Sequence, residues 1–413
     1  MSFTKSNNFS KINSDSNISY LVYTSFDEIS DLHEDWDSFV ESVNGDIYLT
    51  FDWCRLWWKY YGEKRRLQLL LFFSNDKLVG LIPAFVETLW LGALRIRAAK
   101  LIGSDFSLQF CNLPIVPNAL DKVISLTVRH FLGYQQCDIF IAGPLSAGPD
   151  RITRMLSAGQ NEQDLVGSAE SHSKFCATSF ELPGNFDQYL SKIGSRQRGH
   201  YRRSLKQFST NHQVMTDTIS EEGSLLREFD KFHSLHNTQW SSEGKLGHFG
   251  DWPKATAFNR DLIACFGKKG MVRFFRILAD NQVASSQFCF LYGRTNYWRL
   301  PARACSPEWE KLSLGKMGLI QMIETSIAEG ITTIEGGRGH YDYKVQLGGH
   351  ECPLHTIMFI RRGLSATLRV RLFRASASFL HLVYYKFLFT RLAAIFPTLK
   401  RSLWPVWIRS TWQ

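Results

Sequence analysis

The chain has 413 residues, of which 44% are hydrophobic and 14% aromatic, and its formal net charge is +10. This composition excludes a disordered protein and is sufficient for two hydrophobic cores. Ten of the 48 Lys/Arg residues and none of the 38 Asp/Glu residues lie in residues 352–413, so the preceding residues are neutral overall. A neutral body argues against nucleic acid as the main partner, because a nucleic-acid footprint requires a concentrated basic face.

The ends of the chain and its cysteines predict a cytoplasmic protein. Residues 1–17 are rich in Ser and Asn without an apolar run, which predicts a disordered tail rather than a signal peptide. A charge-free apolar run of about 18 residues does not occur. Residues 376–397 come closest, but Lys386 and Arg391 interrupt them. The eight cysteines form no Cys-x-x-Cys pair, which favours reduced, buried thiols.

The first half, residues 18–148, predicts a mixed α/β unit. Its expected elements are a strand at 20–25, helices at 35–42 and 51–62, two strands within 67–87, a helix at 121–133 and a strand at 137–143. Asn75 and Asp76 predict the turn between the two strands. Residues 149–178 are rich in Gly, Ser, Gln and Asn, which predicts a linker.

The second half, residues 179–362, repeats this rhythm of helices and strands. Its expected elements are helices at 185–194, 195–208 and 221–240, a hairpin at 271–293, a strand at 295–304, a helix at 312–330 and strands at 331–335 and 353–363. The shared order predicts a structural duplication. Residues 363–413 predict a basic, aromatic, helical tail.

Three segments carry a likeness beyond element order: SRQRGHYRRSLKQF at 195–208, a stretch at 232–262 that contains FHSLHNTQW, and a stretch at 313–344 that ends in GHYDYK. Together they resemble the GNAT-fold acyltransferases of the CelD/BcsL type, which are associated with cellulose and exopolysaccharide biosynthesis. That family is similar to the tandem-GNAT peptidyltransferases that add amino acids to peptidoglycan precursors. The resemblance implies an α/β (α+β) fold with two GNAT-like mixed-sheet halves in tandem and a basic C-terminal helical tail.

The late motif of that family, an acidic residue-x-x-x-Gly-x-x-x-Tyr-Lys, matches Glu335, Gly339, Tyr343 and Lys344, although the family usually has Asp first. The resemblance implies an acyl-CoA cosubstrate and acyl transfer to an amine or hydroxyl of an envelope or exopolysaccharide-related acceptor. We expect Glu335 to accept a proton from the attacking amine and Tyr343 to donate one to the departing thiolate. Lys344 would hold an anionic substrate group or pair with Glu335, and Gly339 would contact the substrate. Alternatively, the glycines here only permit turns.

A dinucleotide-binding loop is excluded at this motif. Asp342 stands where Gly-x-Gly-x-x-Gly requires its third glycine, counted from Gly337, and the residues that follow do not predict a helix.

A GNAT fold binds the pyrophosphate of coenzyme A at the N-terminus of its central helix, where free N–H groups and the helix dipole attract anions. In the second half this helix begins near residues 312–318. Gly315 and Gly318 would let a phosphate approach the backbone, and Lys316 adds positive charge. The spacing departs from the usual GNAT pattern, and close helix packing is the alternative role of these glycines.

Two further regions are candidate substrate-binding sites. Arg202 and Lys206 lie on the basic side of the helix at 195–208 and would contact phosphates, unless that side is merely solvated. Trp240 and Phe249 flank glycine-rich turns and would line an acceptor cleft, unless they belong to the core. Histidines near Trp240 lack a clustered third ligand, so we expect no metal.

Two other functions stay open: an aminoacyl-tRNA-dependent ligase acting on a cell-wall precursor, and a catalytically silent scaffold of a polysaccharide synthase. The tail is expected either to contact an anionic membrane surface, which would make the protein peripheral, or to pack on the body. The oligomeric state is not predicted.

Overall fold

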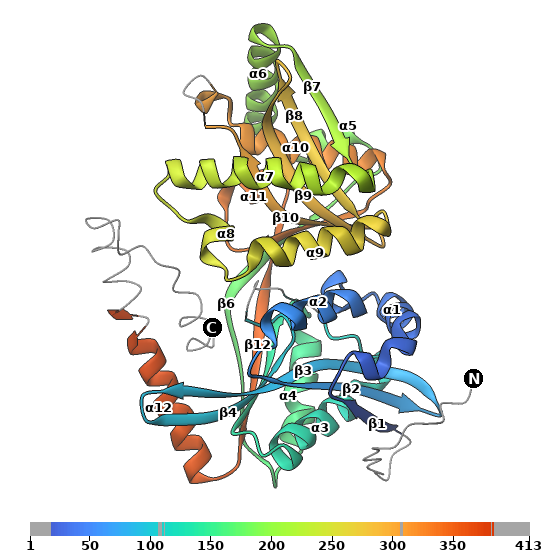
Figure 1. Cartoon of the computed structure of the whole chain (residues 1–413), viewed down its shortest axis with the longest axis vertical. Coiled ribbons are helices and arrows are strands. Elements are labelled where there is room, and N and C mark those ends of the chain that lie inside the picture. The colour runs from blue at the N-terminus through green and yellow to red at the C-terminus, as the bar shows by residue number, and fades with distance from the viewer. Residues whose placement is uncertain (1–17, 106–109, 111, 306–308, 381, 384–413) are drawn as a thin grey trace. The chain divides into compact units, whose positions relative to one another are not determined.

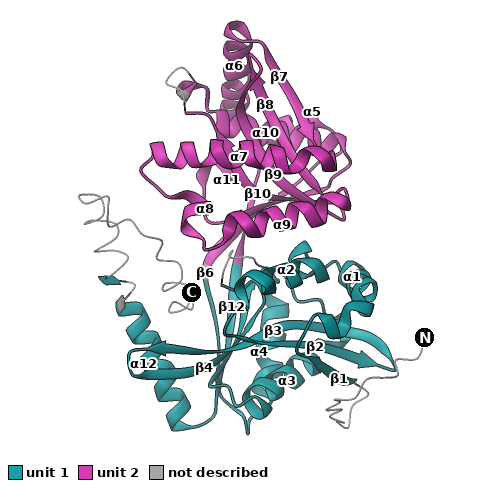
Figure 2. Cartoon of the chain, viewed as in Figure 1, with its two compact units in different colours: residues 1–174, 354–413 teal, residues 175–353 magenta. Residues whose placement is uncertain are grey.

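The computed structural model describes residues 18–105, 110, 112–305, 309–380 and 382–383, and Figure 1 labels its helices and strands. The chain forms two compact units (Figure 2). Unit 1 comprises residues 1–174 and 354–413, and unit 2 comprises residues 175–353. The predicted halves divide the chain differently, since the chain returns to unit 1 at residue 354.

Unit 1 is a mixed sheet with helices. Its elements are β1 (Ile18–Tyr23), α1 (His33–Ser42), α2 (Phe51–Tyr61), β2 (Arg66–Ser74), β3 (Lys77–Leu91), β4 (Leu94–Leu101), α3 (Leu120–Val128), β5 (Ile139–Leu145), α4 (Pro149–Gln160), the latter part of β12 (His350–Arg361) and α12 (Leu364–Leu380). The strand order is β1-β2-β3-β4-β5-β12. Neighbours are antiparallel except for β4 and β5, which are parallel.

Unit 2 has the same kind of sheet. Its elements are the latter part of β6 (Val166–Glu181), α5 (Phe186–Lys192), α6 (Ser195–Asn211), β7 (Val214–Ile219), α7 (Glu222–Ser242), α8 (Gly247–Asp251), α9 (Ala255–Lys268), β8 (Val272–Ala279), β9 (Gln282–Tyr292), β10 (Thr295–Arg303), α10 (Leu314–Ala328), β11 (Thr333–Arg338), α11 (Asp342–Gln346) and the start of β12. The strand order is β7-β8-β9-β10-β11-β6, and only β10 and β11 are parallel.

The predicted duplication is confirmed by the element order. From β1 to β6 the chain runs strand, two helices, three strands, helix, strand, helix, strand, and the principal elements from β7 to β12 repeat this order. The last strand of each repeat is exchanged. β6 closes the first repeat but pairs with β11, whereas β12 closes the second repeat and pairs with β5.

The predicted linker is instead α4 and most of β6. Ile152, Met155 and Ala158, spaced three residues apart on α4, are all less than 5% exposed. Since positions three or four apart share a helix face, the small polar residues between them face outward. The Gly, Ser and Gln content at 149–178 concealed this apolar face.

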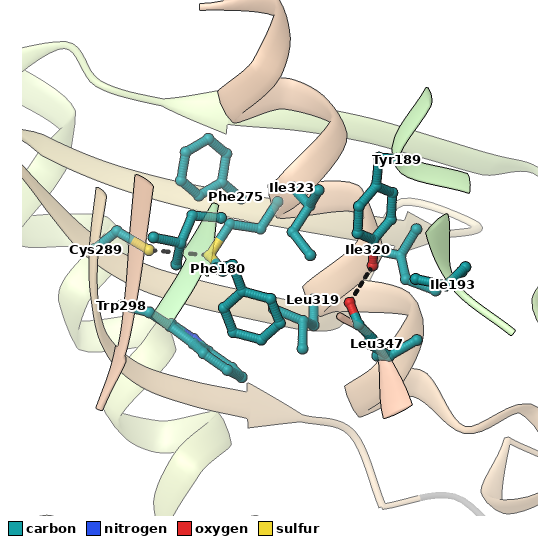
Figure 3. Packing of buried hydrophobic residues seen from close by; sticks show 12 residues of the cluster. Phe180, Tyr189, Ile193, Phe275, Cys289, Trp298, Leu319, Ile320, Ile323 and Leu347 are labelled. Carbon is teal, nitrogen blue, oxygen red and sulfur yellow. Dashed lines mark hydrogen bonds between the residues drawn. The ribbon is translucent and has the colours of Figure 1, made fainter. Parts of the chain in front are cut away.

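The core of unit 2 forms around α10, which has no continuous polar face (Figure 3). Leu319, Ile320 and Ile323 pack in one cluster with Phe180 of β6, Phe275 of β8 and Trp298 of β10. A helix that is apolar on nearly all sides is buried on nearly all sides. At the start of the helix, Leu314 and Met317 pack in a second cluster with Phe208 and Ile277, which fixes the N-terminus of α10.

Candidate active site

A cavity of about 600 Å³ lies in unit 2 where β10 and β11 diverge. The two parallel strands pair only from Thr295–Thr333 to Tyr297–Glu335. Beyond this point β10 continues along β9, while the pairing of β11 with β6 shifts register before Arg338. Residues of α7, β10, α10, β11 and α11 line the space between the separated strand ends.

The N-terminus of α10 forms one wall of the cavity. Ser313 has a left-handed backbone (φ 54°), and it lines the cavity together with Leu314, Gly315 and Lys316. The side chain of Ser313, the N-cap residue, makes no capping hydrogen bond. A Cβ added to Gly315 would have only the Cδ of Arg303 within 4 Å, at 3.9 Å. An anion therefore has room beside the backbone, where the helix dipole favours negative charge.

Gly318, predicted with Gly315 as part of this anion site, lies elsewhere. A Cβ added to it would lie 2.4 Å from both Gln287 Nε2 and Ser285 Oγ of β9. Gly318 is buried and does not line the cavity. Because this position has no side chain, α10 packs closely on the sheet. Close helix packing is the alternative role predicted for this glycine.

Lys344 of α11 is the buried charge of the cavity wall. It is 6% exposed, and its Nζ donates a hydrogen bond to the carbonyl of Gly336 at 2.6 Å. The ammonium lies 4.5 Å from the ring centroid of Tyr341 and 5.2 Å from that of Trp298. Desolvation lowers the pKa of Lys344 to about 8, against a partial opposing effect of Glu335. The side chain is thus mainly protonated at neutral pH.

Tyr343 lines the same cavity, and its ring also packs against the core cluster around α10. Burial raises the pKa of its phenol. The hydroxyl therefore keeps its proton at neutral pH and is able to donate it.

Glu335, the third residue of the predicted set, does not line the cavity. On β11 its neighbours Ile334, in the core cluster, and Gly336, in the cavity lining, are on the other face of the strand, because successive positions of a strand alternate between faces. The carboxylate accepts a hydrogen bond from the N–H of Gly337 at 2.6 Å. Gly337 and Gly339 have φ values of 79° and 106°, so this turn requires glycine. Glu335 thus holds the turn that carries the carbonyl bound by Lys344.

Trp240 and His236 of α7 line the facing wall, joined by a hydrogen bond of 2.9 Å from Trp240 Nε1 to His236 Nε2. Burial lowers the pKa of His236 to about 4, so its imidazole is neutral and carries its proton on Nδ1. Phe249 is not in the lining but packs its ring behind His236, at a centroid distance of 5.1 Å. Gly247 (φ 70°) approaches the Trp240 ring too closely for a Cβ.

His248 of α8, which was not among the predicted site residues, also lines the cavity, and burial lowers its pKa well below the ordinary value. No grouping of three or more His, Cys, Asp or Glu side chains suited to a metal ion occurs in the described part of the chain.

The predicted phosphate contacts Arg202 and Lys206 are exposed on α6 and line neither this cavity nor its neighbour. The neighbouring cavity, of about 320 Å³, is lined by Arg196, Gln197, His200, Arg203, Lys316 and Gln346. Lys316 lines both cavities. The spacing of residues 196, 200 and 203, which share one helix face, was the available signal for this basic pocket.

Most of unit 2 matches a known protein-family model. Residues 195–345, from α6 to α11, match the family model described as "Acetyltransferase (GNAT) domain". All residues that line the larger cavity lie within this range, as do those of the smaller cavity except Gln346. No curated protein matches the chain.

Solved structures extend the likeness to both units. The crystal structure of FemX has a TM-score of 0.59 and 11% identity, and the match covers 83% of this chain and 98% of that one. The C-terminal domain of a putative lysylphosphatidylglycerol synthetase from Agrobacterium fabrum gives a TM-score of 0.48 at 9% identity, with 84% and 96% covered. A tandem GNAT protein from the clavulanic acid pathway gives 0.42 at 10%, with 84% and 99% covered. At 11% identity, the likeness to FemX shows a similar fold and nothing about activity. The other two structures, with TM-scores below 0.5, support no conclusion. The predicted fold class, two GNAT-like mixed-sheet halves, is confirmed.

Proposed function

We propose that this chain is a GNAT acyltransferase of the CelD/BcsL type that moves an acyl group from acyl-CoA to an amine or hydroxyl. Its acceptor would be an envelope or exopolysaccharide-related molecule, and it would act in the cytoplasm at the membrane surface. One observation carries the proposal. The same cavity is bounded by an uncapped helix N-terminus with space for a phosphate and by a buried, positively charged lysine.

The donor's phosphates would occupy the N-terminal end of α10. The N–H groups of Leu314 and Gly315 and the ammonium of Lys316 suit the pyrophosphate, and Gly315 leaves the space. Arg196 and Arg203, in the adjoining basic pocket, suit a further phosphate because guanidinium groups bind phosphate with two parallel hydrogen bonds. This arrangement directs the thioester end of the donor toward the Lys344 side of the larger cavity.

The chemical step would use Lys344 and Tyr343. As the acceptor's nitrogen or oxygen bonds to the thioester carbon, negative charge develops on the carbonyl oxygen, and the ammonium of Lys344 stabilises it. When the carbon–sulfur bond breaks, the thiolate takes the proton of the Tyr343 hydroxyl. The acceptor's surplus proton passes to water, which restores the phenol. Glu335 acts here as a positioning residue, since its carboxylate holds the turn at Gly337.

The acceptor would enter along the wall formed by Trp240. Sugars stack on aromatic faces, and the Trp240 ring is fixed by its hydrogen bond to His236. Phe249 supports this wall from behind, and Gly339 shapes the turn on the opposite side.

A second candidate, an aminoacyl-tRNA donor, is favoured by one observation. Arg202, Arg203 and Lys206 form a run of exposed cations on α6, next to the basic pocket. Such a run suits the phosphates of a polynucleotide. The third candidate, a silent scaffold, gives the ammonium of Lys344 no role, although burying a charge is costly.

Calorimetric titration with acetyl-CoA and longer acyl-CoAs tests the proposal. Wild type should bind at least one of them saturably, and Gly315→Trp should abolish binding by filling the space beside the helix end. Gly223→Trp is the matched control, because a Cβ at Gly223 on α7 has no neighbour within 4 Å.

The absence of binding to any acyl-CoA would reject the primary proposal. A filter-binding assay with aminoacyl-tRNA then decides between the other two candidates. Retention that Arg203→Gln weakens would support the tRNA-dependent reaction, and no retention would leave the scaffold.

A further inference from the structure

The helix α12 of unit 1 has two apolar faces. Its inner face, formed by Ala366, Val370, Phe373 and Ala377, is 0–2% exposed. Val370 and Phe373 pack in one cluster with residues of β3 and β4, beside which α12 lies in Figure 1. The inner face therefore fastens the helix to the core of unit 1.

The opposite side of α12 is also apolar but is open to solvent. Leu364, Leu368, Leu372 and Phe379 are 93%, 59%, 45% and 64% exposed. We call these four residues the outer face. At about 100° per residue they fall within an arc of about 80°, roughly opposite the inner face. A surface helix in water usually has a polar side there, so an apolar stripe of this length marks an interaction surface.

The charge around the outer face indicates what it binds. Arg371 is exposed on the flank of the stripe, whereas two other arginines of α12 are occupied. Arg369 donates to Asp138 at 2.6 Å, and Arg374 donates to Glu170 at 2.9 Å. Within α12 itself, residues 364–380 include three Arg and no Asp or Glu.

The positive charge of α12 distinguishes between two possible partners of the outer face, a second copy of the chain and an anionic lipid surface. Two copies of the chain facing each other through α12 would bring like charges together, which disfavours a dimer through this face. An anionic lipid surface attracts the same charges and also accepts the apolar side chains. The described helices include none that is long and apolar enough to cross a membrane, so α12 would lie in the plane of the surface.

We propose that the outer face of α12 docks unit 1 onto an anionic membrane surface, with leucine and phenylalanine side chains inserted among the acyl chains and Arg371 at the head groups. The inner face keeps the helix attached to the protein while the outer face is buried in lipid. This inference does not depend on the reaction proposed for unit 2.

Co-sedimentation of the full chain with vesicles tests the proposal. One set of vesicles contains phosphatidylcholine alone, and the other contains equal parts of phosphatidylcholine and phosphatidylglycerol. Wild type should sediment with the anionic vesicles and much less with the neutral ones. The triple variant Leu368→Ser, Leu372→Ser, Phe379→Ser should weaken binding about tenfold or more. Arg371→Gln should weaken it about fivefold, which corresponds to about 1 kcal/mol.

The control is a triple variant at exposed apolar residues outside α12: Tyr134→Ser, Leu205→Ser and Met215→Ser, which replace side chains 53%, 36% and 47% exposed. It should bind as wild type does. Circular dichroism and thermal melting verify that each variant folds, as substitution of exposed side chains should permit.

Three results would overturn the proposal. Wild type could fail to sediment with anionic vesicles, or it could bind neutral and anionic vesicles equally. The α12 triple variant could also bind as wild type does, which would assign the contact to another segment. Sedimentation velocity without vesicles supplies a further check: a dimer that the α12 variant dissociates would make this face a protein interface instead.

Discussion

The ends of the central strands differ between the two units, although both units have the same strand order. In unit 2 the divergence of β10 and β11 opens a cavity of about 600 Å³. In unit 1 the corresponding strands are β4 and β5, and Leu101, Ala142 and Leu145 at their ends are 0–3% exposed. Strand order therefore defines where a site can form, and the side chains beyond the last paired residues decide whether it does.

The two units also differ in their buried lysines: in unit 1 the lysine is bound to a carboxylate, and in unit 2 it lines the cavity. In unit 1, Lys100 binds Glu87 at 2.8 Å, and Arg65 binds Glu87 at 3.1 Å and Asp105 at 2.7 Å. These charges neutralise one another within the protein. In unit 2, Lys344 donates to a carbonyl and faces aromatic rings, so its charge is available to a ligand.

The largest effect is expected from Glu87→Ala in unit 1. It leaves Arg65 and Lys100 buried with less compensating charge, so the free energy of unfolding should fall by about 3–5 kcal/mol. Urea denaturation measures this. Asp121→Ala, which removes an exposed pair with Arg154, should cost at most about 1 kcal/mol. Equal losses in the two variants would show that the buried network is not structural.

The same substitution at the two lysines should give opposite results. Lys344→Met should lower kcat/KM by about 10²–10³ without loss of stability, because a buried charge that serves catalysis is removed. Lys100→Met should lower stability and leave kcat/KM unchanged. Acyl-transfer assays and denaturation of both variants check this. Retained activity in Lys344→Met would contradict the role assigned to that lysine.

The two glycines of α10 have different roles: Gly318 permits packing on the sheet, and Gly315 leaves space for a ligand. Gly318→Ala should destabilise unit 2 by about 1–3 kcal/mol, because its Cβ would overlap Gln287 and Ser285. Gly315→Ala has open space and should be neutral or slightly stabilising. Thermal unfolding of the two variants provides the measurement, and a larger loss for Gly315→Ala would refute the assignment.

The smallest effect is expected in the pH dependence of kcat/KM. The protonated form of Lys344 is the active one, and its pKa is about 8. Activity should therefore fall as pH rises through about 8, approaching tenfold per pH unit above it. Lys344→Arg, whose guanidinium stays protonated, should lack this descending limb. An unchanged limb in that variant would mean that another group titrates.

Local signals in the sequence predicted much of the fold. The turn predicted at Asn75-Asp76 is confirmed, and both residues have positive φ. The hairpin predicted at 271–293 is confirmed as β8 and β9, and the helix predicted at 51–62 is confirmed as α2. The prediction that no helix follows Gly339 is wrong, because residues 342–346 form the one-turn helix α11; five residues with glycines on both sides carry no helical periodicity. The exchange of β6 and β12 was not predictable either, since the partner of a strand is set by contacts far away in the sequence.

The candidate site was predicted in part. Tyr343 and Lys344 do share a cavity with Gly315, Lys316 and Trp240. The motif placed Glu335 with them, but strand alternation turns its side chain away. The basic pocket was not predicted, because Lys316 and Gln346 join Arg196 and Arg203 there only through contacts between segments far apart in the sequence. The catalytic and binding roles of all these residues remain predictions.

The exchange of last strands has a consequence for how the chain is made. A ribosome releases β5 long before it releases residues 354–361 of β12, with which β5 pairs. Until then the sheet of unit 1 has an unpaired edge at one of its most buried strands. The first 174 residues alone should therefore be an incomplete folding unit that is prone to aggregate, and unit 1 should mature only after unit 2 has been synthesised.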